Sequence, residues 1–183
     1  MKRIFAAVKI NPQPALIKYS EELKLHLSDS NIKWVEIHNL HLTIKFFGET
    51  NDEKVIEIEE ALKNIQAAPF DFEIGNLKIF GSRYDPRVIF LEALHAEPFL
   101  ALSSLVNEQI SPLGYEPDRQ NFIPHLTLGR VKKIADKKYF QKIISDFSGK
   151  IIQSQHVGEF HLIESILRNT GPEYKILQSY KFF

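Results

Sequence analysis

One short pattern occurs twice, and it limits the possible folds of this chain more than any other feature. The copies are His41–Ile44 (His-Leu-Thr-Ile) and His125–Leu128 (His-Leu-Thr-Leu), each inside an alternating apolar stretch typical of a β-strand. Side chains alternate between the two faces of a strand. Each copy therefore places its histidine and threonine on one face and its aliphatic residues on the other. Two such strands meeting across a cleft would surround a small anion with two imidazoles and two hydroxyl groups.

The same alternation predicts faces for the residues that follow each pattern. It puts Phe46 on the aliphatic face, and Lys45 on the histidine face, where it would meet phosphate or simply be solvated. In the second strand, Arg130 falls on the face opposite the histidine unless the strand bends at Gly129.

The composition excludes several classes of function. The chain has 183 residues, which suits one domain or two small lobes, and it contains no cysteine. Disulfides, a thiol nucleophile and thiolate metal sites are therefore excluded, and the composition fits a reducing cytoplasm. The residues Met1–Phe5 are typical of a strand rather than a signal peptide, and no apolar run is long enough to span a bilayer. We expect a cytoplasmic protein without a membrane partner.

The charge balance limits how nucleic acid could be bound. Lysine plus arginine and aspartate plus glutamate are equal at 23 each, so the net charge is zero. Binding through the whole surface is disfavoured, and any RNA contact must come from a local patch. The densest basic stretch runs from Lys132 to Lys142, and its simpler interpretation is a solvated helix face.

The order of the expected elements indicates a mixed α+β protein with two strand-rich halves and no linker between them. Thr50 and Glu53 form a capping-box pattern at the start of the second helix, Gly48 ends the strand before it, and Gly171 lies in the last turn. We expect strands over 2–10, 32–37, 40–47, 70–80, 87–94, 125–131, 158–167 and 174–183, helices over 12–27, 50–65 and 99–110 and one through 139–147, and a loop over 114–124.

Three stretches carry a resemblance to a known family. Trp34 with Asn39–Glu49 is similar to a first signature, Pro86–Phe90 to an intervening strand, and Phe122–Arg130 to a second signature. The chain resembles the two-histidine (2H) phosphoesterases, most closely the bacterial and archaeal RNA 2′,3′-cyclic phosphodiesterases, also called 2′-5′ RNA ligases. The resemblance covers nearly the whole chain, including the opening strand Arg3–Ala7 and, at the closing hairpin, Ser165, Gly171 and Tyr174.

The resemblance implies a bilobal, pseudo-two-fold α+β fold of the LigT-like type. Two antiparallel sheets would face each other across a groove with helices outside, each lobe would supply one histidine, and residues 1–183 would form a single domain. The loop Gly81–Asp85 is shorter and less basic than in some relatives, which leaves the range of substrates open.

The resemblance also implies a reaction, the hydrolysis of RNA 2′,3′-cyclic phosphate ends to 2′-phosphate ends without metal or cofactor. Such a reaction needs a base, an acid and donors to the anionic oxygens. By resemblance, His125 is the general base, His41 the general acid, and Thr43 and Thr127 donate to the phosphoryl oxygens. Arg130 is a binding candidate, with a surface salt bridge as the alternative. The two patterns are near copies, so the residues alone do not separate acid from base.

Other functions remain open at this point. The reverse reaction would make the chain a 2′-5′ RNA ligase, and a non-catalytic module would only bind RNA ends. The substrate would be an RNA end or a small cyclic nucleotide, and we expect a monomer. The remaining histidines do not favour a zinc hydrolase. His161 has Ile163 where the pattern needs threonine, so we expect it to be structural. His38 and His41 are three residues apart, a spacing that suits a metal on a helix but points to opposite faces of a strand.

Overall fold

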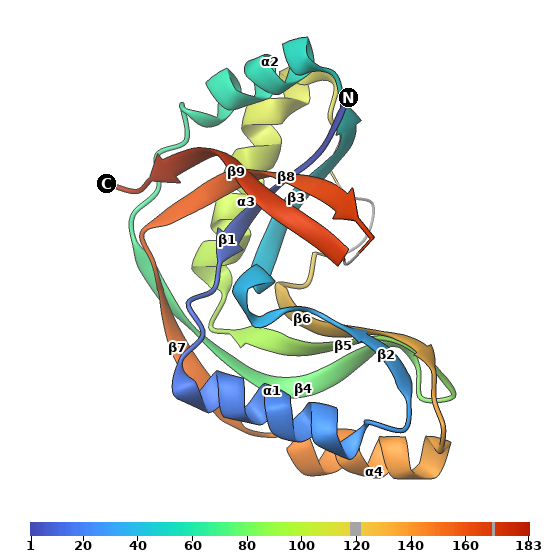
Figure 1. Cartoon of the computed structure of the whole chain (residues 1–183). Coiled ribbons are helices and arrows are strands. Elements are labelled where there is room, and N and C mark those ends of the chain that lie inside the picture. The colour runs from blue at the N-terminus through green and yellow to red at the C-terminus, as the bar shows by residue number, and fades with distance from the viewer. Residues whose placement is uncertain (118–121, 170) are drawn as a thin grey trace.

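The computed structural model describes residues 1–117, 122–169 and 171–183, as an alternation of strands and helices (Figure 1). In chain order the elements are β1 (Lys2–Lys9), α1 (Pro14–His26), β2 (Asn31–Trp34), the 3₁₀ turn η1 (Ile37–Asn39), β3 (His41–Thr50), α2 (Asp52–Leu62), β4 (Phe70–Ser82), β5 (Asp85–Leu94), α3 (Glu97–Ile110), the 3₁₀ turn η2 (Ser111–Leu113), β6 (His125–Lys133), α4 (Lys137–Phe147), β7 (Ile151–Val157), β8 (Glu159–Arg168) and β9 (Gly171–Lys181). No helix in the described ranges is long and apolar enough to cross a membrane.

The strands form one antiparallel sheet of nine strands that curls strongly and divides into two lobes (Figure 1). Its order is β7-β4-β5-β6-β3-β1-β8-β9, with β2 paired to β6. The upper lobe in Figure 1 holds β3, β1, β8 and β9 with α2 and α3, and the lower lobe holds the other strands with α1 and α4. The α+β class and the two-lobe plan are confirmed. The two expected sheets, however, are joined at one residue pair, Leu42 with Leu126.

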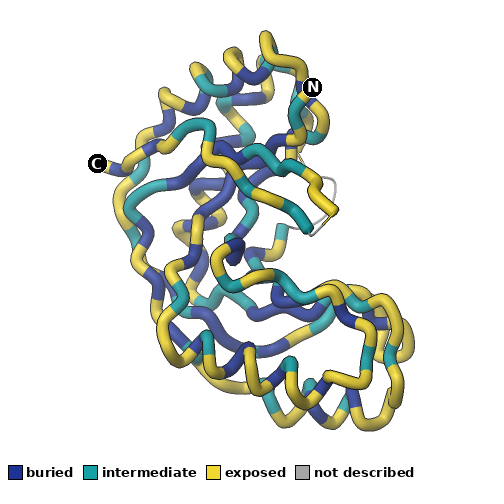
Figure 2. The backbone as a smooth tube through the Cα atoms, in the orientation of Figure 1, coloured by how far each residue is buried: buried dark blue, intermediate teal, exposed yellow. Residues whose placement is uncertain are grey.

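A continuous core lies beneath the aliphatic face of this sheet, and the tube in Figure 2 shows buried residues running through both lobes. Leu42, Ile44, Leu126 and Leu128 are all at most 1% exposed, as the alternation in the two histidine strands predicts. The strand β1 is buried on both faces, because Phe5 and Ala7 pack in a small second cluster on the side opposite the main core.

A β-bulge in β3 corrects two predictions about the first strand. The pairing with β1 passes from Ala6–Lys45 to Ala7–Thr43 and so skips Ile44. An extra residue reverses the alternation beyond it. Lys45 is therefore buried, at 3% exposure, and its ammonium donates to the backbone carbonyl of Glu116 at 2.7 Å. Phe46 is instead 58% exposed and lies against Phe5, on the histidine side of the sheet.

A matching bulge in β6 answers the open question about Arg130. Pairing with β5 passes from Ile89–Gly129 to Phe90–Thr127, so that Leu128 is skipped. The strand therefore does change its alternation beside Gly129, and Arg130 points to the same side as His125 and Thr127. Straight alternation would have placed it on the core side.

Other local predictions need smaller corrections. The cap of α2 is Asn51, whose side chain accepts from the backbone N–H of Lys54, rather than Thr50. Gly48 lies inside β3 at a second bulge with a φ of +77°, and Gly171 lies inside β9 rather than in the turn. The strand β7 was not predicted. Part of the expected 114–124 loop lies outside the described residues.

Close packing at Gly129 makes a testable prediction. A Cβ at this position would lie 2.8 Å from Ile32 Cγ2 and 2.8 Å from Trp34 Cε3. We expect Gly129→Ala to lower the free energy of unfolding by about 1–3 kcal/mol, because β2 must shift away from β6. Gly158→Ala is the matched control, since its Cβ would meet only His156 Nε2 at 3.9 Å. Equal urea midpoints for the two variants would contradict the prediction.

Candidate active site

The pairing between the two lobes brings both copies of the His-x-Thr pattern to one face of the sheet. Leu42 and Leu126 are directly opposite each other in the antiparallel register. Their neighbours on each strand project to the other side, so all four polar side chains, His41, Thr43, His125 and Thr127, share that side. We call this side of β3 and β6 the histidine face. It brings together the two histidines and the two threonines of the repeated pattern.

His41 is held by one hydrogen bond and two aromatic rings. Its Nδ1 lies 2.7 Å from the carbonyl oxygen of Asn39, and the Asn39 side-chain amide donates to the carbonyl of Pro172 at 3.1 Å. The rings of Phe5 and Tyr174 lie against the imidazole, with centroids at 5.0 and 5.1 Å. Residues from η1, β1 and β9 thus fix the position of this side chain.

His125 has an equivalent setting built from the other lobe. Its Nδ1 lies 2.7 Å from the carbonyl oxygen of Ile123, again two residues earlier in the chain. The rings of Phe80 and Phe90 meet the imidazole nearly edge-on, with centroids at 4.8 and 5.3 Å. The repeated pattern therefore produces a repeated environment as well as a repeated strand.

These carbonyl contacts set the protonation pattern of both rings. A backbone carbonyl only accepts hydrogen bonds, so Nδ1 must carry the proton and donate it in each histidine. The neutral ring then keeps its lone pair on Nε2, and the protonated ring offers an N–H there. Each histidine can accordingly accept or donate a proton through Nε2 without turning its ring.

Burial lowers the pKa of both histidines below the ordinary value of 6.5. For His41, burial is the largest cause, the contact with Asn39 opposes it, and the charges of His125 and Arg130 lower the pKa further. For His125, burial again comes first, opposed by the contact with Ile123 and assisted by Arg130. Both rings are therefore neutral at pH 7 without a bound anion, and Arg130 lies within electrostatic reach of both.

The two threonines and Arg130 are free to meet a ligand. Thr43 and Thr127 are half-buried, and within the described part of the chain neither hydroxyl is hydrogen-bonded to another protein group. Arg130 is exposed. Two hydroxyl donors and one guanidinium next to two neutral imidazoles make a site for an anion that undergoes proton transfer.

Comparison with known proteins identifies the family. A model of the LigT-like phosphoesterases matches residues 8–90 and 94–174. The chain belongs to this family. Among curated relatives, this LigT-like phosphoesterase is 32% identical to the RNA 2′,3′-cyclic phosphodiesterase of Archaeoglobus fulgidus, over 98% of this chain and 99% of the relative. It is also 32% identical to the protein of the same name from Thermotoga maritima, over 98% of this chain and 95% of the relative.

Solved structures agree with the fold of this LigT-like phosphoesterase. A Thermus thermophilus protein superimposes with a TM-score of 0.77 at 27% identity, covering 98% of this chain and 97% of that one. Escherichia coli LigT superimposes with a TM-score of 0.72 at 19% identity, covering 99% and 97% of the two chains.

Sequence reasoning missed the aromatic walls of this LigT-like phosphoesterase site. Phe80 and Phe90 went unassigned, and Tyr174 was noted only as part of the closing hairpin. The structure reveals this role for Phe90, because β5 pairs with β6 and places Phe90 directly opposite Thr127, a pairing that the sequence alone does not show. Within the described residues, no group of three or more histidine, aspartate or glutamate side chains is placed to hold a metal ion.

The lowered pKa values predict an acid-sensitive fold for this LigT-like phosphoesterase. The unfolded chain binds protons at the two histidines from about pH 6.5 downward, whereas the folded chain binds them only at lower pH. Stability is therefore complete above pH 6.5 and falls below it, by up to about 1.4 kcal/mol per pH unit and per histidine until the folded pKa is reached. We expect His41→Asn to lose less stability than the parent in urea titrations between pH 7 and pH 5. An equal or greater loss would contradict the burial argument.

Proposed function

We propose that this chain hydrolyses RNA 2′,3′-cyclic phosphate ends to 2′-phosphate ends by acid–base catalysis with two histidines. The supporting observation is the pair of imidazoles on one face, each with Nδ1 bound to a carbonyl and Nε2 left for proton transfer. Relatives at 32% identity over nearly the full length are named RNA 2′,3′-cyclic phosphodiesterases, which supports the same substrate class. We also propose that residues 1–183 act as one domain and as a cytoplasmic monomer, because one chain supplies both histidines and contains no cysteine.

In the proposed reaction, His125 Nε2 takes a proton from water as the water oxygen attacks phosphorus. The bond from phosphorus to the 3′ oxygen breaks on the far side, and the Nε2–H of protonated His41 donates its proton to that oxygen. The products are a 2′-phosphate and a 3′-hydroxyl. Thr43 and Thr127 donate hydrogen bonds to the non-bridging oxygens, and Arg130 balances their negative charge. The bound anion raises the pKa of His41, which supplies the proton that the free site lacks at pH 7.

The test is a turnover assay with an oligoribonucleotide that ends in a 2′,3′-cyclic phosphate, carried out in EDTA. We expect conversion to a 2′-phosphate end. Unchanged RNA throughout the range from about pH 5 to about pH 9 would refute the proposal. Adding a second RNA with a 5′-hydroxyl tests the reverse reaction, since a hydroxyl in place of water would give a 2′-5′ linkage and a ligase.

The pH profile separates catalysis from mere binding of RNA ends. Values of kcat/KM report the pKa values of the free enzyme. The base must be neutral and the acid protonated, and both pKa values lie below 6.5. We therefore expect a bell-shaped profile of kcat/KM with its maximum below pH 6.5. The maximum of kcat should lie at higher pH, because bound phosphate raises both pKa values. Affinity that falls steadily with rising pH, without turnover, would favour a binding module instead.

A further inference from the structure

A second feature lies at the tip of the lower lobe. A cavity of about 630 Å³ is bounded by the turn between β4 and β5, the end of β6 and the start of α4. Neither histidine lines it. Its volume is within the range of small-molecule sites, although its walls are polar rather than apolar.

The walls of this cavity are strongly basic. They carry Arg87, Arg130, Lys132, Lys133 and Lys137, against one carboxylate, that of Asp85. The chain as a whole has no net charge, so this excess is local. Among the residues that the structure describes, the three lysines have no ion pair, and all are exposed. Charges concentrated in a hollow attract an anion more strongly than the same charges spread over a surface.

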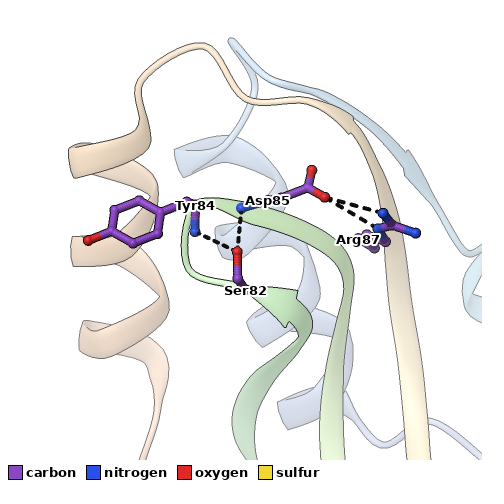
Figure 3. A network of polar contacts seen from close by, with 4 residues as sticks. All are labelled: Ser82, Tyr84, Asp85 and Arg87. Atoms are coloured by element: carbon purple, nitrogen blue, oxygen red, sulfur yellow. Dashed lines mark hydrogen bonds and ion pairs between the residues drawn. The ribbon is translucent and has the colours of Figure 1, made fainter.

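The turn that forms one wall is held in place by its own hydrogen bonds (Figure 3). The Ser82 hydroxyl accepts from the backbone N–H groups of Tyr84, at 3.2 Å, and Asp85, at 3.0 Å. The Asp85 carboxylate lies 3.4 Å from the guanidinium of Arg87. From α4, the Gln141 amide donates to the carbonyl of Arg83 at 3.0 Å. The wall is thus ordered before any ligand binds.

Arg130 connects this cavity to the histidine face. It lines the cavity, and its charge also reaches both histidines and Tyr174. On the neighbouring strand β2, the exposed Lys33 is directly opposite Arg130 in the register, so its side chain lies on the same side of the sheet. The charge of Arg130 therefore acts on both the histidines and the cavity, and Lys33 adds a second positive charge on the same side of the sheet.

We propose that this cavity is a subsite for the backbone phosphates of an RNA strand whose cyclic end lies at the histidines. This inference rests on the proposed function and specifies its substrate as a polynucleotide rather than a mononucleotide. An RNA that ends in a 2′,3′-cyclic phosphate continues only through the 5′ oxygen of its last nucleotide. The RNA must therefore leave the histidine face from the 5′ side of its last nucleotide. Its phosphodiester anions fit the basic cavity that Arg130 connects to that face. The contacts are to phosphate and carry no base specificity.

The test compares two substrates in two matched triple variants. One variant, Lys132→Gln with Lys133→Gln and Lys137→Gln, removes three charges from the cavity. The control, Lys18→Gln with Lys63→Gln and Lys150→Gln, removes three exposed charges that do not line it. The substrates are 2′,3′-cyclic AMP, which has no further phosphate, and a short oligoribonucleotide with the same cyclic end. Each protein is assayed at several salt concentrations.

We expect the cavity variant to lose about tenfold in kcat/KM on the oligonucleotide and nothing on cyclic AMP. The slope of log kcat/KM against log salt on the oligonucleotide should become shallower by about 2, at about 0.7 for each lost phosphate contact. The control should match the parent on both substrates. Equal losses on both substrates, or no loss on either, would overturn the proposal.

Binding measured without turnover keeps this inference separate from the proposed reaction. Fluorescence anisotropy with a labelled oligoribonucleotide that carries a 2′-phosphate end gives a Kd even if no cyclic phosphate is hydrolysed. We expect the cavity variant to raise this Kd by about tenfold and the control to leave it unchanged. An unaltered Kd in the cavity variant would refute the subsite, whereas absent turnover with the expected change in Kd would refute only the reaction.

A gain of affinity provides an independent check. Asp85→Asn removes the carboxylate from the cavity wall and releases Arg87 from its ion pair, while the backbone bond to Ser82 remains. We expect kcat/KM on the oligonucleotide to rise about twofold to threefold, with no change on cyclic AMP. A misfolded variant would not bind more tightly, so this result cannot arise from damage to the fold. A decrease on the oligonucleotide would count against the subsite.

Discussion

Replacing either histidine of the face by asparagine is expected to lower kcat on RNA 2′,3′-cyclic phosphate ends by about 10²- to 10⁴-fold. Asparagine is chosen because its amide can still donate to the backbone carbonyl that Nδ1 contacts. This carbonyl belongs to Asn39 in the case of His41 and to Ile123 in the case of His125. The Nε2 position is lost, and with it the group that moves the proton. Rates from single-turnover assays near the pH optimum provide the measurement. The double variant should cost much less than the product of the two single losses, because acid and base act in one step.

His161 offers a matched control within the same chain. It is less exposed than His41 and His125, at 6% exposure, its Nδ1 lies 2.9 Å from the Ser179 hydroxyl, and burial lowers its pKa. His161→Asn should therefore cost stability and leave kcat within about twofold of the parent. Comparable kcat losses at His161 and His41 would mean that the histidine variants act through the fold rather than through proton transfer.

A substrate with a better leaving group would separate the roles of the two histidines. A 2′,3′-cyclic phosphate with sulfur at the 3′ bridging position expels a thiolate, which needs little help from an acid. On this substrate we expect His41→Asn to regain most of its lost rate and His125→Asn to remain slow, since the water must still lose its proton. Recovery by His125→Asn instead would reverse the assignment of acid and base.

The sequence predicted the parts of this site that depend on simple alternation. His41 and Thr43 share a face, as do His125 and Thr127, because the first three residues of each pattern lie before the bulge in their strand. The core side of each strand was predicted for the same reason.

The errors began at the bulges. A bulge depends on how a strand pairs with its neighbour, and a single strand's sequence does not reveal it. Lys45 was therefore placed on the wrong face, and the side of Arg130 was left open. Phe46 follows His41 by the same number of residues as Arg130 follows His125. Aligning the two copies beyond their fourth residue would have shown that Phe46 and Arg130 are equivalent.

The missed strand β7 has a different cause. Its inward residues include Gln153 and Gln155, which are buried at 4% and 7% exposure, so the stretch lacks the apolar alternation of a half-buried strand. Gln153 accepts from the backbone N–H of Gln13, and Gln155 from that of Asn11, just before α1. Polar side chains that satisfy buried backbone groups from a distant segment are recognisable only once the tertiary structure is known.

The two threonines should show the second large effect, and they should show it almost equally. Thr43→Val and Thr127→Val keep the shape of the side chain and remove only the hydroxyl. Loss of one donor to a developing phosphoryl charge is expected to lower kcat by about 10²- to 10³-fold. Stability should change by less than about 0.5 kcal/mol, because within the described residues neither hydroxyl has a protein partner to leave unsatisfied.

Thr50→Val is the control for these variants, because it makes the same chemical change in β3, the strand that also holds Thr43. The Thr50 hydroxyl is buried and donates to the carbonyl of Gly48 at 3.3 Å, so its removal should cost about 0.5–1.5 kcal/mol of stability and no activity. The near equality expected for Thr43 and Thr127 follows from the pairing of Leu42 with Leu126, which places each threonine one residue beyond the same junction between the lobes. Losses that differ by more than about tenfold would mean that the phosphate lies closer to one lobe, and kcat values for the two valine variants decide between these outcomes.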